Sequence, residues 1–149
     1  MLGSNYETYT AAQLPAPAGT LLVGGKNDVG QRGLGYTTSV DAKLTAVPGL
    51  TDVVKVDTDV WGTTLALTGD GTLWAWGSNK DGMLGDGGAK DSYKPVKVPV
   101  GGTVVDMVIA DDAEGNGRGY AVTSNGELWS WWQGHKPSLV SGVPKMWPG

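Results

Sequence analysis

"GTLWAWGSNKDGMLGDGG", residues 71–88, joins a tryptophan-rich segment to a run of glycines with Asn, Lys and Asp between them. Such a stretch suits a binding site, a phosphate-binding loop or one unit of a repeated scaffold. Its recurrence along the chain favours the scaffold. "ALTGDGTLWAW" begins at Ala66, and "AVTSNGELWSW" begins at Ala121, about 55 residues later. "GTLLVGGKNDVGQRGLG" begins at Gly19, about 52 residues before the quoted stretch.

The repeat extends beyond this hairpin. Residues 43–56, 94–109 and 136–147 each place one short valine-containing segment before another. We therefore divide residues 19–149 into three units, at about 19–62, 63–117 and 118–149, preceded by an arm of residues 1–18. The loop positions shared by the first two units are Gly25, Asn27, Gly30, Gly33 and Gly35, and Gly77, Asn79, Gly82, Gly85 and Gly87.

Each unit predicts four short strands. In the second unit, residues 65–68 lead through a Gly-Asp-Gly turn into residues 72–76, because Asp-Gly between alternating apolar residues is a strong hairpin signal. A third strand near residues 95–98 contains a proline, which suits the edge of a sheet. The fourth, residues 104–110, is almost continuously apolar, so we expect it to be the most buried.

Units of about 50 residues with four strands each indicate blades of an all-β propeller rather than a sandwich. The pattern ALT-x-DG-x-LWAWG-x-N-x-x-G-x-LG-x-G, followed by P-x-x-V, resembles the repeat of the regulator of chromosome condensation family. The resemblance implies blades of a seven-bladed propeller. The second unit matches over nearly its full length, the first lacks a clear first strand, and the third replaces the long glycine loop by "WWQGHKPS".

About three units cannot close a ring, because propellers typically have four to eight blades. The sequence thus predicts a partial propeller of about three four-stranded blades, to which residues 6–10 in the N-terminal arm are a candidate extra strand. An open arc leaves unpaired strand edges. We therefore expect protein partners, either further copies in a homo-oligomer that completes the ring or other subunits of an assembly. A monomeric arc and another packing of the same hairpins stay open as alternatives.

Composition narrows the function. The net charge of −4, with scattered lysines, opposes binding to nucleic acid. The chain has no cysteine, its N-terminus lacks the features of a signal peptide, and no apolar run approaches the roughly 20 residues that span a membrane. We expect synthesis in the cytoplasm, no membrane and no cofactor. The glycine loop lacks the Gly-Lys-Ser/Thr of a phosphate-binding loop, so its glycines have a structural role.

The tryptophans fall into two groups. The paired residues of the hairpins should form blade core, with their indole N–H groups bonded to carbonyls; they are Trp74, Trp76, Trp129 and Trp131. Trp132 breaks the alternation, while Trp61 and Trp147 lie near loops or the chain end, where a partner could bury them. Together with His135, these three are the candidate interaction residues.

Two other patterns are weak candidates for chemistry. Asp112, Glu114, Asn116 and Gly117 have spacings like the start of a calcium loop, but the distal glutamate is absent because Thr123 stands there. A long turn is the preferred interpretation. His135 and Ser138 lack the carboxylate of a hydrolytic triad, which favours a surface position for the histidine.

We therefore expect a non-enzymatic structural or interaction protein. Small, cysteine-free, β-rich proteins that depend on assembly are common in bacteriophage particles, so a virion component (capsid decoration, collar or tail-associated) is the specific expectation, by analogy. The alternative is a carbohydrate- or receptor-binding module that uses exposed tryptophans and loop residues.

Overall fold

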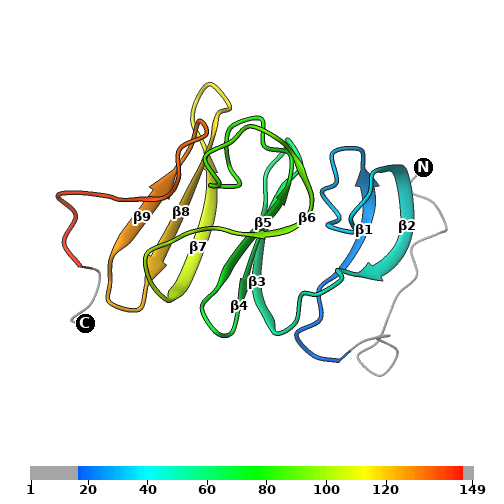
Figure 1. Cartoon of the computed structure of the whole chain (residues 1–149), viewed down its shortest axis with the longest axis horizontal. Helices are drawn as coiled ribbons and strands as arrows, with labels where there is room; N and C mark the ends of the chain where they lie inside the picture. Colours follow the sequence, from blue (N-terminus) through cyan, green and yellow to red (C-terminus); the bar gives the residue numbers. More distant parts are fainter. Residues whose placement is uncertain (1–16, 146–149) are drawn as a thin grey trace.

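The computed structural model describes residues 17–145 (Figure 1). These residues form ten β-strands and no helix. None of them belongs to a helix that could cross a membrane. The strands are β1 (Leu22–Asn27), β2 (Thr38–Ala46), β3 (Val53–Thr58), β4 (Thr63–Thr68), β5 (Leu73–Gly77), β6 (Ser92–Lys97), β7 (Val104–Asp111), β8 (Gly117–Thr123), β9 (Leu128–Trp131) and β10 (Ser138–Leu139).

The strands form three antiparallel sheets that stand in a row (Figure 1). The first blade has two strands, β1 and β2; the second has the order β3-β4-β5-β6, and the third the order β7-β8-β9-β10. This confirms the all-β, partial-propeller prediction. Among the described residues, two blades have four strands and the first has two. The candidate strand at residues 6–10 lies outside the described part of the chain.

The sheets are displaced by one strand from the sequence repeat. The hairpin predicted in the second unit is β4–β5, and the proline-containing strand is β6, which lies at the edge of its sheet as expected. The fourth predicted strand is β7, which begins the next sheet instead of completing its own. Each four-stranded blade therefore takes its first strand from the preceding unit, so that consecutive units are joined by strand pairing as well as by packing.

The expectation that residues 104–110 would be the most buried strand is wrong. β7 is mostly exposed, with Val105 and Val108 each close to half exposed, whereas all six residues of β4 are buried. Position in the sheet explains the difference. β7 is an edge strand of its blade, while β4 is an interior strand whose sheet packs between two neighbouring blades. Apolar composition does not distinguish these two positions.

Two apolar clusters hold the blades together. One is built from Leu73 and Ala75 on one face of β5 together with Met107 and Trp131 of the third blade. The other contains Trp76, on the opposite face of β5, packed with Val47 and Leu50 from the segment between the first two blades. The alternation predicted along β5 therefore supplies both interfaces of the second blade.

A candidate interaction face

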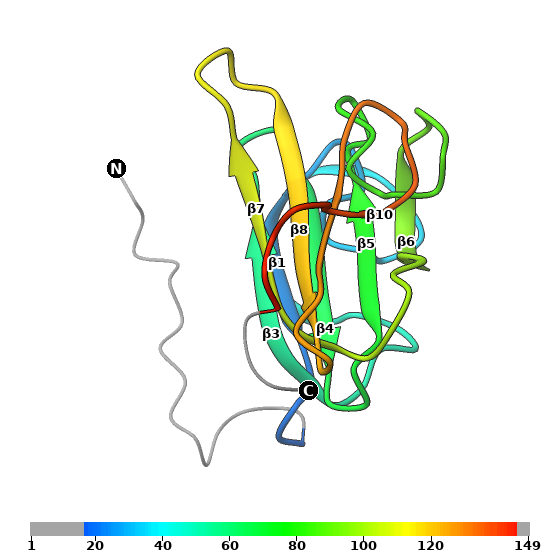
Figure 2. The same ribbon diagram turned by 90° about the vertical axis from the view of Figure 1, so that its left-hand side faces the viewer.

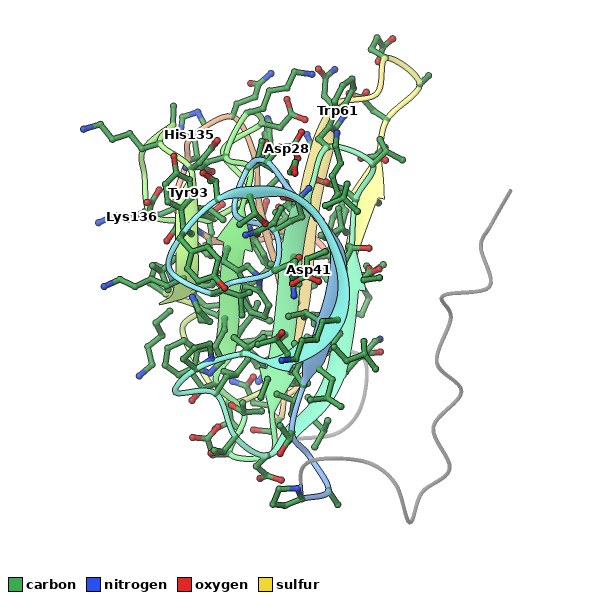
Figure 3. All side chains as sticks on the ribbon, turned by 90° about the vertical axis from the view of Figure 1, so that its right-hand side faces the viewer. Asp28, Asp41, Trp61, Tyr93, His135 and Lys136 are labelled. Atoms are coloured by element: carbon green, nitrogen blue, oxygen red, sulfur yellow. The ribbon has the colours of Figure 1, made fainter. Side chains whose placement is uncertain are left out.

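Loops of five hairpins gather at one end of the molecule (Figure 1). Because the strands are antiparallel, every second connection returns to the same end of the sheets. At this end lie residues 28–37, 59–62, 78–91, 112–116 and 132–137. Figure 3 shows Trp61 and His135 at this end, on opposite sides of the view.

A buried asparagine organises each long glycine loop. The side-chain oxygen of Asn79 accepts the N–H of Leu84 at 3.0 Å, and its amide nitrogen donates to the carbonyl of Gly88 at 3.1 Å. Asn27 makes the equivalent pair of bonds in the first blade, with Arg32 and Tyr36. Neither asparagine is accessible to solvent. The repeated Asn-x-x-Gly-x-x-Gly pattern therefore specifies a loop conformation.

A tryptophan of each following blade fixes the loop to its neighbour. The indole N–H of Trp131 donates to the carbonyl of Met83 at 2.8 Å, and that of Trp76 donates to the carbonyl of Gln31 at 2.9 Å. Both tryptophans are fully buried. These are the indole-to-carbonyl bonds expected for core tryptophans.

The other pair of hairpin tryptophans is less enclosed. Trp74 is half-buried and donates to the hydroxyl of Thr68 at 3.3 Å. Trp129 is also half-buried, and its indole N–H is inaccessible and has no hydrogen-bond partner. They correspond to each other in the repeat, and each lies on the same strand as a fully buried tryptophan, two residues before it.

Trp61 lies on the surface, between the second and third blades. Its side chain is 44% exposed, and its indole N–H donates to the carbonyl of Gly115 at 3.0 Å. The ammonium of Lys80 stands 3.6 Å from the centre of its ring. A cation this close to an indole face is attracted by the ring quadrupole. The ring is therefore held in place while much of it stays accessible.

Trp132 forms a second cation–indole pair in the third blade. The guanidinium of Arg118 lies 3.7 Å from the centre of the Trp132 ring, and the ring of His135 meets it edge-on at 6.2 Å. His135 itself is exposed. We call the loop-end surface that carries Trp61, Lys80, Arg118 and Trp132 the cation–tryptophan face, with His135 at its margin. The two pairs lie on opposite sides of the third sheet, because Trp131, the neighbour of Trp132, points to the second blade.

The loop between these two pairs is acidic and held by hydrogen bonds within itself. Asp112 accepts the backbone N–H groups of Glu114 and Asn116, at 3.0 and 2.8 Å, as well as the side-chain amide of Asn116. These bonds, that from the Asn116 amide foremost, hold the pKa of the Asp112 carboxyl below its ordinary value. The residues considered for calcium thus form a self-bonded turn. The structure shows no cluster of metal-binding side chains between residues 17 and 145.

The structure brings three of the predicted side chains to one end of the molecule, namely Trp61, Trp132 and His135; Trp147 lies outside the described residues. The sequence prediction missed the two cations of the face. Lys80 stands in a glycine loop and Arg118 at the start of β8, far in sequence from the ring that each covers. Arg118 stands opposite Trp132 one position beyond the Gly119–Trp131 pair of β8 and β9, and Trp61 and Lys80 lie just beyond the Thr63–Gly77 pair of β4 and β5, so the register of each hairpin brings its cation to its ring.

Comparison with known proteins supports the repeat. Models of the regulator of chromosome condensation (RCC1) repeat match residues 53–82 and 70–112. The human E3 ubiquitin-protein ligase HERC2 is 35% identical over 79 residues, which cover 52% of this chain and 2% of that protein. The ultraviolet-B receptor UVR8 of Arabidopsis thaliana is 35% identical over 78 residues, which cover 52% of this chain and 17% of the receptor. The chain thus spans a small part of these relatives.

Solved structures agree at the level of the fold. Prp20p of Saccharomyces cerevisiae, whose structure was described with its binding properties to Gsp1p and histones, has a TM-score of 0.67 at 18% identity, covering 83% of this chain and 34% of Prp20p. Human WBSCR16 has a TM-score of 0.65 at 18% identity, covering 85% of this chain and 35% of that one. The chain therefore resembles the regulator of chromosome condensation repeat family in sequence, and it folds as part of a β-propeller.

Proposed function

We propose that this chain is a non-enzymatic interaction subunit, and that its cation–tryptophan face contacts a second copy of the chain in a homo-oligomer. The observation that carries the proposal is the face itself. Two tryptophans, each with a cation against its ring, stand on loops at the same end of adjacent blades. Trp and Arg are the residue types that most often dominate the energy of protein interfaces.

The charges around the face suit a second copy. The acidic Asp112–Asn116 turn lies beside two cations, so the same surface carries both donors and acceptors of ion pairs. A two-fold interface needs such self-complementarity, because each patch meets its own equivalent. The Prp20p structure was described with binding to Gsp1p and histones. Proteins of these two classes are the alternative partners for the face.

Photo-cross-linking tests this face. His135→p-benzoylphenylalanine places a photoreactive group at the margin of the face, and Thr51→p-benzoylphenylalanine places the same group on an exposed loop at the opposite end of the sheets. We expect covalent dimers from position 135 and none from position 51. Equal yields at both positions, or no dimer from position 135, would contradict the proposal. Cross-links from position 135 to added Gsp1p or histones, in place of dimers, would replace the second copy by another partner.

A bacteriophage particle remains the more specific candidate for the assembly, on the grounds of size, the absence of cysteine and dependence on partners. Detection of the chain in purified particles tests it. Carbohydrate binding also stays a prediction. It is less favoured, because a cation already occupies one face of each candidate ring. Tryptophan fluorescence that does not change across a broad glycan panel would remove it.

A further inference from the structure

Gln133 has a backbone conformation that elsewhere in this fold belongs almost entirely to glycine. Its φ is +51°, and within residues 17–145 the other non-glycine residue with a positive φ is Asp52, at +55°. A side chain in this left-handed region strains the backbone, and glycine avoids that strain. Where β5 ends in the second blade, the residue with a positive φ is Gly77. The third blade thus has a glutamine where its backbone favours glycine.

Contact with the second blade holds Gln133 in this conformation. Its N–H donates to the carbonyl of Asp81 at 2.7 Å. The next residue, Gly134, lies so close to Gly82 that a Cβ on Gly82 would collide with its backbone nitrogen. These are backbone contacts, which a glycine at position 133 would make equally well. The glutamine side chain is exposed and forms no hydrogen bond to any described residue, so the fold does not account for it.

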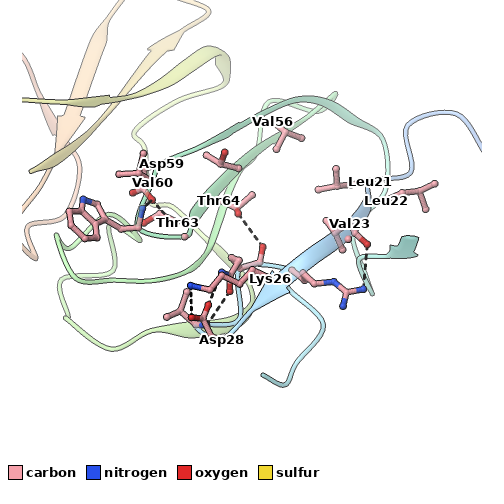
Figure 4. Close-up of a pocket in the computed structure, with 17 residues that line it drawn as sticks. Leu21, Leu22, Val23, Lys26, Asp28, Val56, Asp59, Val60, Thr63 and Thr64 are labelled. Atoms are coloured by element: carbon pink, nitrogen blue, oxygen red, sulfur yellow. Dashed lines mark hydrogen bonds and ion pairs between the residues drawn. The ribbon is translucent and has the colours of Figure 1, made fainter. Parts of the chain in front are cut away.

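The Gln133 side chain stands beside the cation–tryptophan face. Two hollows border this face: a cleft of about 720 Å³ at Trp61, between β1 and the second blade (Figure 4), and a groove of about 310 Å³ at Trp132. Gln133 lines the groove together with Arg118. Figure 2 looks onto the third blade and shows the loop after β9 at the same end as the loop between β7 and β8. A partner that covers this part of the face therefore meets Gln133.

We propose that Gln133 determines the specificity of the homo-oligomer contact, and that its side-chain amide pairs with the same amide of a second copy across a two-fold axis. This inference rests on the proposed association through the cation–tryptophan face. A primary amide carries both donors and an acceptor, so it can pair with its own equivalent. A charged side chain on the axis would instead meet its own charge. An isologous interface needs such self-complementarity.

The other side-chain amide that lines the groove is already bonded. Asn116 donates its amide N–H groups to the two carboxylate oxygens of Asp112, at 3.1 and 3.0 Å. The amide of Gln133 is open, and it is flanked in the groove by the carboxylate of Asp112 and the guanidinium of Arg118. Around a central pair of amides, these charges of opposite sign can face each other between the two copies.

Sedimentation equilibrium of the full chain, combined with urea denaturation at concentrations where it is monomeric, tests the pairing. Gln133→Gly removes the amide and the strain together. Its dissociation constant should rise by roughly tenfold, while the urea midpoint should not fall. Asp52→Gly is the matched control: it relieves the same kind of strain at the opposite end of the sheets and should leave the dissociation constant unchanged. Gln133→Glu keeps the side-chain length but brings two carboxylates together, so it should weaken association more than the glycine variant.

An unchanged dissociation constant in Gln133→Gly would overturn the proposal. A lowered urea midpoint would also overturn it, because the side chain would then support the fold, and so would equal weakening by Asp52→Gly. Failure of the pairing is distinguishable from failure of the face. If Gln133→Gly associates like the wild type while Trp61→Ala/Trp132→Ala is monomeric, the amide pairing alone is wrong. A monomeric wild type would contradict both.

Discussion

Gly82 shows at the scale of one residue why the repeat needs glycine. A Cβ added there would collide with the backbone nitrogen of Gly134 in the next blade, and the residue has a φ of +66°. Gly35 has a similar conformation, with a φ of +88°, but a Cβ there would meet no atom within 4 Å. The two glycines therefore separate the cost of conformation from the cost of contact between blades.

We expect Gly82→Ala to lower the free energy of unfolding by roughly 1–3 kcal/mol more than Gly35→Ala. Both variants carry the strain of alanine at positive φ, so the difference between them measures the collision. Urea denaturation of the two proteins gives both values. Equal losses would show that the loop of the second blade does not touch the third blade.

Asp70 gives the stability a defined pH dependence. Its carboxylate accepts hydrogen bonds from the hydroxyl of Thr68 at 2.7 Å and from the N–H of Thr72 at 3.1 Å. These bonds, that from Thr68 first, lower the pKa of Asp70 from its ordinary value of 3.8. A lowered pKa in the folded state means that the stabilisation is complete well above pH 4 and is lost as the pH falls through the folded value.

Asp70→Asn should therefore melt at a lower temperature than the wild type at pH 7, by a modest amount because the carboxyl is exposed. The difference in Tm should shrink steadily below pH 4. Thermal melts followed by circular dichroism at pH 7, 4 and 2.5 check this. A difference that is constant over that range would show that the charge of Asp70 does not contribute.

Side chains of β3, an edge strand of the second blade, bond to β7, an edge strand of the third blade. The carboxylate of Asp57 in β3 accepts the backbone N–H of Ile109 in β7 at 2.8 Å, and Lys55 in β3 forms an ion pair with Asp106 in β7. Neither β3 nor β7 has another strand on this side among the described residues. The carboxylate of Asp57 thus accepts a backbone N–H of β7 that no described neighbouring strand bonds.

Asp57→Ala should cost about 1–3 kcal/mol of stability, because the N–H of Ile109 loses its partner. Asp57→Asn keeps an oxygen acceptor and should lose less. Amide exchange at Ile109 locates the effect: it should accelerate in the alanine variant and stay close to the wild-type rate in the asparagine variant. Unchanged exchange in both would show that this contact does not hold the blades together.

The hairpins were predictable at the scale of these elements, and the positions of the strands in the sheets were not. The Gly-Asp-Gly turn and the alternation of Leu73, Trp74, Ala75 and Trp76 are local signals, and they gave β4, β5 and the two faces of the blade. The exposure of β7 depends on which sheet it joins, which no local pattern records. Lys80 and Arg118 were missed for another reason: each meets its ring beyond the last pair of a hairpin, in a register that the end points of the strands decide.

The open arc, taken as a whole molecule, exposes apolar groups at its inner edges as well as the face at its loop end. Val54 and Val108 are 60% and 46% exposed, on β3 and β7 respectively. Such edges are aggregation hazards that proteins usually cover. Association through the cation–tryptophan face is the contact that we propose to bring copies together.

The mass of the chain in solution, measured by light scattering over a range of concentrations, tests the central claim that it is an interaction subunit. We expect a dimer or larger closed oligomer for the wild type and for Val40→Ala, which truncates an exposed apolar residue of β2 that is not part of the face. Trp61→Ala/Trp132→Ala should be monomeric. A wild-type protein that stays monomeric up to roughly 100 µM, well above the dissociation constants of stable interfaces, would contradict the claim.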